Sequence, residues 1–123
     1  MNSNNNKKIY IADDDHAIVD AIKLVLENKG FEVQFTYDGH DVKAMLKYPP
    51  DVLLLDIWMS GTDGGTICKM LKKDMETRNI PVILMSAHPK APTISKECGA
   101  DGYILKPFSI NDLLNKISEV AII

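Results

Sequence analysis

Apolar residues occur along this chain in two alternating patterns, short continuous runs and longer stretches with helical spacing. The short runs predict strands at residues 8–12, 31–35, 52–55, 81–85 and 102–105. Helical spacing predicts helices at residues 15–29, near 42–46, near 67–71, before residue 98 and after residue 109. Five strand–helix pairs in alternation predict an α/β fold, with one parallel sheet, helices on both faces and right-handed crossovers.

The composition of each run indicates the place of its strand in the sheet. Residues 52–55 and 81–85 are continuously apolar, as expected for strands covered on both faces. By contrast, Phe31, Val33 and Phe35 alternate with polar residues, which is typical of an edge strand with one face more exposed to solvent. Numbered along the chain, the strands are therefore predicted to form a doubly wound, five-stranded parallel sheet in the order 2-1-3-4-5.

Capping residues and prolines mark the ends of several predicted helices. Asp15 is expected to cap the first helix, and Ser109 to Asp112 have the pattern of a capping box. Prolines at positions 89 and 92 disfavour helical structure before Cys98. We therefore expect the fourth helix to be short and mobile.

Charged or hydroxyl residues follow four of the five predicted strands. They are Asp13 and Asp14, Asp56, Ser86, and Lys106. The carboxyl ends of parallel strands lie at one edge of the sheet, and ligands bind there at the switch point between strands 1 and 3. Carboxylates 4 Å apart repel by about 1 kcal/mol in water, and by more near a protein surface. We therefore expect a bound cation, and Mg²⁺, which accepts one or two carboxylates together with waters and phosphate, suits these ligands.

The same residue types can support phosphoryl transfer. Asp56 stands alone after its strand and could act as a nucleophile, because carboxylates form acyl phosphates. Mg²⁺, the Lys106 ammonium and the Ser86 hydroxyl could then neutralise the oxygens of the phosphoryl group. A backbone carbonyl just past Asp56 could supply a further oxygen ligand to the metal.

The ordered set of motifs resembles the receiver domain of two-component response regulators, including the chemotaxis regulators, over roughly residues 7–121. The matching stretches are Ile11-Ala12-Asp13-Asp14-Asp15, Asp51-Val52-Leu53-Leu54-Leu55-Asp56-Ile57-Trp58-Met59, Gly61, Asp63-Gly64, Ser86-Ala87, Gly99-Ala100-Asp101-Gly102-Tyr103 and Lys106-Pro107-Phe108. The resemblance implies a flavodoxin-like fold with Asp56 as the phosphorylated residue. It also implies that Asp13 and Asp14 bind Mg²⁺ together with the backbone carbonyl of Trp58.

The resemblance further implies the remaining roles and the partners. Lys106 would contact the phosphoryl group, and Ser86 and Tyr103 would be the switch residues. A histidine kinase or histidine phosphotransferase would be the donor. An output partner would bind the face of helix 4, strand 5 and helix 5, and a homodimer is possible. The domain would assist its own phosphorylation and dephosphorylation rather than act as a metabolic enzyme. The Lys106-Pro107 bond is expected to be cis.

One position departs from the family pattern. Ser60 stands where the family usually has proline. Because that proline shapes the loop rather than the chemistry, we expect a looser loop and retained activity.

Length, charge and cysteine content narrow the function class. The 123 residues fit one domain, which we place at residues 7–123 after a disordered lead-in at residues 1–6. A net charge of −3 gives no nucleic-acid footprint, and no apolar run is long enough for a membrane span. There is no signal-peptide core, and Cys68 and Cys98 lack CxxC spacing. We therefore expect a cytoplasmic protein with two free thiols and no membrane or nucleic-acid partner.

Three alternative functions are compatible with parts of the pattern. A haloacid-dehalogenase-type phosphohydrolase also uses an aspartyl nucleophile and Mg²⁺, but it needs a second Asp where Trp58 stands. A flavodoxin-like electron carrier would need a phosphate-binding loop rich in hydroxyl residues and glycine where Asp13 and its neighbours stand. A binding module that is not phosphorylated would be expected to have lost one of the site residues, and none is lost.

Overall fold

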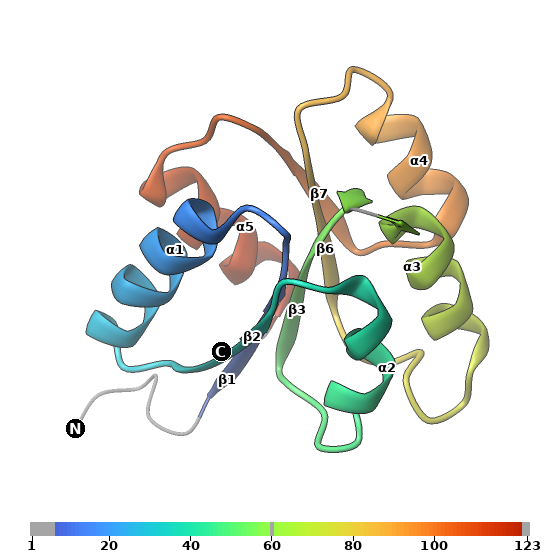
Figure 1. The fold of residues 1–123 in the computed structure, drawn as a ribbon, viewed down its shortest axis with the longest axis horizontal. Helices are drawn as coiled ribbons and strands as arrows, with labels where there is room; N and C mark the ends of the chain where they lie inside the picture. Colours follow the sequence, from blue (N-terminus) through green and yellow to red (C-terminus); the bar gives the residue numbers. More distant parts are fainter. Residues whose placement is uncertain (1–6, 60, 122–123) are drawn as a thin grey trace.

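The computed structural model, which describes residues 7–59 and 61–121, has a five-stranded parallel sheet between two layers of helices (Figure 1). The strands are β1 (Lys8–Ala12), β2 (Glu32–Thr36), β3 (Val52–Asp56), β6 (Val82–Ser86) and β7 (Gly102–Leu105). Their order is β2-β1-β3-β6-β7, and every neighbouring pair is parallel. The predicted order 2-1-3-4-5 is confirmed. The predicted lead-in at residues 1–6 lies outside the described residues.

The helices cover both faces of the sheet (Figure 1). One face carries α1 (His16–Asn28) and α5 (Ile110–Val120). The other carries α2 (Val42–Met45), α3 (Gly64–Lys73) and α4 (Ala91–Cys98), and the 3-10 helix η1 (Gly39–Asp41) leads into α2. The doubly wound arrangement predicted from the sequence is therefore confirmed.

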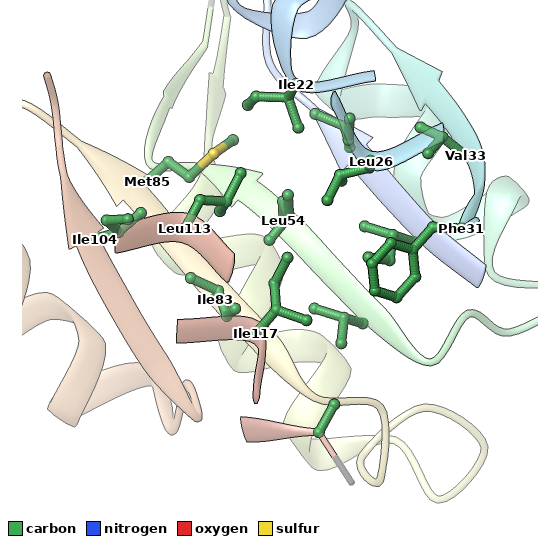
Figure 2. Packing of buried hydrophobic residues seen from close by; sticks show 14 of the residues in the cluster. Ile22, Leu26, Phe31, Val33, Leu54, Ile83, Met85, Ile104, Leu113 and Ile117 are labelled. Atoms are coloured by element: carbon green, nitrogen blue, oxygen red, sulfur yellow. The ribbon is translucent and has the colours of Figure 1, made fainter. Parts of the chain in front are cut away.

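Two apolar cores form because the central strands are covered on both faces. Every residue of β3 and β6 is buried. Beneath α1 and α5, side chains such as Leu26, Leu54 and Leu113 pack together (Figure 2). On the opposite face, Leu55 and Leu84 pack against residues of α2, α3 and α4. These cores hold the strand ends in place, and the candidate site lies at those ends.

The alternation predicted for the second strand holds only over its first part. Phe31 and Val33 are buried, and β2 is an edge strand, as expected. Phe35, however, is 38% exposed, whereas Thr36 is buried. The edge strand has a neighbour on one side only, and the Phe35 ring lies 5.2 Å from the ring of Tyr37. Phe35 therefore lies on the same face of the sheet as Val33, but it is less covered than the alternation predicted.

The helix ends follow the predicted capping residues. The Asp15 side chain accepts hydrogen bonds from the backbone N–H groups of Ala17 and Ile18 at the start of α1. At α5, Ser109 and Asp112 form the reciprocal capping box. Helix α4 has eight residues and no side-chain cap, so its predicted shortness is confirmed. Its predicted mobility remains a prediction.

A small antiparallel ribbon after β3 was not predicted from the sequence. It pairs β4 (Trp58–Met59) with β5 (Thr62–Asp63). Gly61 adopts φ +71° at the turn of this ribbon, a left-handed conformation that glycine accepts without strain. Ser60 lies outside the described residues, so the effect of the missing proline remains a prediction.

No helix within residues 7–59 and 61–121 combines the length and the apolar content needed to cross a lipid bilayer.

Candidate functional site

Three charged side chains reach one site because each stands two positions after a core residue of a strand. These charged residues are Asp13, Asp56 and Lys106. The core residues that precede them are Ile11, Leu54 and Ile104, all buried beneath α1 and α5. Residues two apart in a strand face the same side of the sheet. The strand-like pairing continues past β1 and β7, because Asp13 N–H donates to Thr36 and Lys106 N–H donates to Ser86.

Asp13, Asp14 and Asp56 form a compact carboxylate cluster. One oxygen from each side chain lies within 4.8 Å of the others. Asp13 is completely buried, Asp56 is 5% exposed, and Asp14 is half-buried. Because buried carboxylates at this separation repel one another, the cluster is unfavourable unless positive charge lies nearby.

Lys106 supplies positive charge to this cluster. Its Nζ lies 2.8 Å from Asp13 Oδ2 and 3.4 Å from Asp56 Oδ1. Burial opposes the charged form, but the hydrogen bond and charge of Asp13, followed by those of Asp56, outweigh it and raise the pKa of Lys106. The ammonium therefore stays charged at neutral pH and sits closer to Asp13 than to Asp56.

Lys106 contacts two carboxylates, Asp13 and Asp56, and the ionised form of Asp56 has the fewer stabilising contacts. Burial and the negative charge of Asp13 raise its pKa to about 6, although Lys106 acts in the opposite direction. Asp13, in contrast, accepts hydrogen bonds at both oxygens, from the Asp15 N–H at 2.9 Å and from Lys106 at 2.8 Å. The carboxylate with fewer compensating contacts is thus the one at the end of the central strand β3.

The donor set fits a hard divalent cation. Three carboxylates and one ammonium leave two negative charges on these four groups when all are ionised. Oxygen ligands and this charge suit Mg²⁺, which usually retains several waters and takes few carboxylates. Asp13, Asp14 and Asp56 are the side chains that would hold it.

Ser86 and Tyr103 lie on the side of the sheet that faces α4. Ser86 pairs with Leu105 and Leu84 pairs with Tyr103, so the side chains of these four residues share one face. The buried Ser86 Oγ accepts a hydrogen bond from the His88 N–H at 2.9 Å. It does not cap α4, whose N-cap is Lys90. Tyr103 is half-buried, packs against the core under α4, and has Lys116 Nζ 5.9 Å from its ring centroid.

The site opens to solvent through a cleft of about 500 Å³. Trp58 and His88 stand on its rim, with their ring centroids 6.1 Å apart, and the Trp58 side chain is left half exposed. The cleft also reaches Asp56, Ser86 and Lys106. A phosphoryl group could therefore approach Asp56 from solvent without a rearrangement of the core.

Gly64 helps to position Asp56, a role that was not predicted from the sequence. Its N–H donates to the Ile57 carbonyl at 2.6 Å, and a Cβ at this residue would overlap the Asp56 carbonyl oxygen. Asp63 caps α3 by accepting from the Gly65 N–H. The Asp-Gly-Gly sequence shortly after Asp56 was the available signal, because glycine allows close approach of backbones.

Comparison with protein families gives one match over most of the chain. The family model described as the response regulator receiver domain matches residues 9–118.

Solved structures of receiver domains superpose on nearly the whole chain. The chemotaxis protein CheY4 of Vibrio cholerae has 26% identity and a TM-score of 0.85, with 93% of this chain and 98% of that chain covered. The Francisella response regulator 1452 receiver domain has 31% identity and a TM-score of 0.83, with 94% and 96% covered. A CheY-like receiver domain protein from Methanospirillum hungatei has 31% identity and a TM-score of 0.84, with 92% and 91% covered.

Proposed function

This chain belongs to the response regulator receiver domain family, and on that premise we propose that Asp56 accepts a phosphoryl group in a reaction that depends on Mg²⁺. The donor is a histidine kinase or a histidine phosphotransferase. One observation carries the proposal: the Asp13, Asp14 and Asp56 carboxylates lie within 4.8 Å, and Lys106 contacts two of them.

In the proposed reaction the ionised Asp56 carboxylate attacks the phosphorus of a phosphohistidine. A bond forms from an Asp56 oxygen to phosphorus, the phosphorus–nitrogen bond breaks, and the imidazole leaves with its electron pair. Lys106 needs to shift only from Asp13 towards Asp56 to place its ammonium on a phosphoryl oxygen. The Ser86 hydroxyl can donate to another oxygen.

Asp13, Asp14, Asp56 and the Trp58 backbone carbonyl are the proposed metal ligands. Mg²⁺ bound there would neutralise negative charge on the cluster and on the phosphoryl oxygens. In the structure Asp13 accepts hydrogen bonds from Lys106 and from the Asp15 N–H, so its orientation is fixed before a metal binds.

The proposed output depends on Ser86 and Tyr103. If Ser86 turns towards a phosphoryl group on Asp56, it gives up its hydrogen bond with the His88 N–H and vacates space on the face beneath α4. Tyr103 shares that face and is only half-buried, so it can move inward. The surface formed by α4, β7 and α5 would then change shape for an output partner or a second copy of the chain.

Intact-mass measurement after incubation with acetyl phosphate tests the proposed function. The wild type with Mg²⁺ should gain the mass of one phosphoryl group, and should gain none when EDTA replaces Mg²⁺. Asp56→Asn should gain none in either condition. The exposed α1 variant Asp20→Asn is the matched control and should behave as the wild type. No gain of mass in the wild type would favour a binding module that is not phosphorylated.

A further inference from the structure

Two cysteine side chains meet between α3 and α4, outside the phosphoryl site. Cys68 is completely buried and Cys98 is 6% exposed. The Cys68 Sγ donates to the Cys98 carbonyl oxygen at 3.7 Å, and Cys98 Sγ donates to the Ser95 carbonyl oxygen at 3.6 Å. The Cys68 sulfur therefore lies directly against residue Cys98, although 30 residues separate the two cysteines in the sequence.

The two thiols differ in their access to solvent. A cavity of about 260 Å³ between α3, α4 and the β4–β5 ribbon is lined by Cys98, with the exposed residues Thr66, Lys69 and Glu97 at its sides. Cys68 does not line this cavity and lies behind Cys98. A small reagent in this cavity can thus approach residue Cys98 more closely than Cys68.

We propose that Cys68 and Cys98 are a reversible dithiol that a low-molecular-weight disulfide oxidises to an intramolecular bridge between α3 and α4. The Cys98 sulfur first attacks the reagent disulfide, which forms a mixed disulfide and releases one reagent thiol. The Cys68 sulfur then attacks the Cys98 sulfur and releases the second reagent thiol. Two protein thiols are oxidised and one reagent disulfide is reduced to two thiols, each of which carries one of the protons lost by the protein.

The order of the two steps follows from the surroundings of the thiols. Burial, followed by the hydrogen bond with Cys98, raises the pKa of the Cys68 thiol. A thiol that is buried and rarely ionised is a poor first nucleophile towards an external reagent. Once Cys98 carries the mixed disulfide, its sulfur lies next to Cys68, and proximity favours the second step.

The bridge would join two helices that begin next to the phosphoryl site. Helix α3 starts at Gly64, whose N–H is bonded to Ile57 just after Asp56. Helix α4 follows the loop after Ser86, the last residue of β6, and its Ala91 N–H donates to the His88 carbonyl oxygen. A covalent tie between α3 and α4 would therefore oppose a relative movement of these helices. The proposal does not depend on phosphorylation of Asp56.

The test is incubation of the folded protein with glutathione disulfide, followed by acid quenching, alkylation in denaturant and intact-mass measurement. The wild type should give a monomer that has lost two hydrogen atoms and carries neither glutathione nor alkyl groups. Excess reduced glutathione should restore two thiols that can be alkylated. Cys68→Ser should stop at one glutathione on Cys98, and Cys98→Ser should keep an unmodified thiol at Cys68.

Circular dichroism before incubation checks that each variant is folded, and Cys68→Ala replaces Cys68→Ser if serine is not accepted at this buried position. Three results would overturn the proposal. They are two alkylated thiols in the incubated wild type, a stable glutathione adduct on Cys98 of the wild type, or a bridge that forms only when denaturant is present.

Discussion

Asp56 is the residue at which burial and function oppose each other. The side chain is almost fully buried at the end of the central strand β3, where the Asp13 carboxylate adds repulsion. Lys106 compensates in part, but its shorter contact is with Asp13, at 2.8 Å against 3.4 Å. Because the negative charge at Asp56 is only partly compensated by Lys106, this carboxylate is suited to bind a cation and a phosphoryl group.

The raised pKa of Asp56 predicts a dependence of stability on pH in the metal-free protein. The pKa is about 6 in the folded state against an ordinary 3.8, so between these values the folded protein binds more protons than the unfolded chain. The free energy of unfolding therefore falls as pH rises from about 4 to about 6 and then levels off. The penalty from Asp56 at neutral pH is at most about 3 kcal/mol.

Asp56→Asn should remove this penalty. Urea denaturation in EDTA should show the variant to be more stable than the wild type at about pH 7.5 and similar to it at about pH 3.5. The exposed Asp20→Asn should change the free energy of unfolding by less than about 0.5 kcal/mol at both pH values. A variant that is no more stable than the wild type at the higher pH would contradict the assigned cause.

The identity of the site residues could be predicted from the sequence, but the relative distances from Lys106 to Asp13 and to Asp56 could not. Asp13, Asp56 and Lys106 each stand two positions after a core residue of a strand, so pattern and topology place them together. Whether the lysine sits closer to Asp13 or to Asp56 depends on tenths of an ångström in backbone packing. No periodicity in the sequence carries that information.

Helix α3 is positioned by the close approach of its first residue to the end of β3. A side chain at Gly64 would overlap the backbone of Asp56. A Cβ at Gly65 would meet only side-chain atoms, the Ile94 Cγ2 methyl at 3.0 Å and Asp63 Oδ1 at 3.2 Å. The two adjacent glycines of this chain therefore differ in what surrounds them.

Alanine at these two glycines should have different effects. Gly64→Ala should lower the free energy of unfolding by about 2 kcal/mol or more, because backbone atoms cannot move aside cheaply. Gly65→Ala should change it by less than about 1 kcal/mol, since the two side-chain atoms in the way need to give by only a few tenths of an ångström and alanine favours the helix. Chemical denaturation measures both variants. Equal losses would show that the close approach at Gly64 does not position α3.

Helix α5 should depend measurably on its capping box. Ser109→Ala removes the hydroxyl that accepts from the Asp112 N–H at 3.0 Å, and it should cost about 1 kcal/mol in thermal or chemical denaturation. Ser118, exposed in the same helix, provides the control. Because alanine favours a helix interior, Ser118→Ala should be neutral or slightly stabilising. A neutral Ser109→Ala would contradict the role of the cap.

At the scale of elements, long periodic segments were predictable and short ones were not. The helical spacing of apolar residues and the short apolar runs predicted the main helices and strands correctly, with ends within one or two residues for most of them. The β4–β5 ribbon has two residues in each strand, too few for alternation to show. Alternation alone made Phe35 look like a buried residue. Its exposure depends on how the edge of the sheet is covered, which is a matter of tertiary structure that alternation does not report.

At the scale of the whole molecule, Mg²⁺ should stabilise the fold. A cation that binds the folded state relieves repulsion among Asp13, Asp14 and Asp56, and at 100 times its dissociation constant it adds about 2.7 kcal/mol. The melting temperature should rise along a Mg²⁺ titration, and much less in Asp13→Asn.

Trp58 offers a second measurement of the same binding. It is the one tryptophan of the sequence and stands on the rim of the site, so its fluorescence should change over the same Mg²⁺ range. A flat melting temperature together with flat fluorescence would contradict the metal site.

Three further statements remain predictions. They are the cytoplasmic location, the domain boundary at residue 7 and the identity of the donor protein.

Chemical localisation of the phosphoryl group tests the central claim most directly. After incubation with acetyl phosphate and Mg²⁺, borohydride reduces an aspartyl phosphate to homoserine, and peptide mass spectrometry identifies the modified position. The account predicts homoserine at position 56 in the wild type, and at no position when EDTA replaces Mg²⁺. Homoserine at position 13 or 14, or an unmodified position 56 in a protein that has bound Mg²⁺, would contradict it.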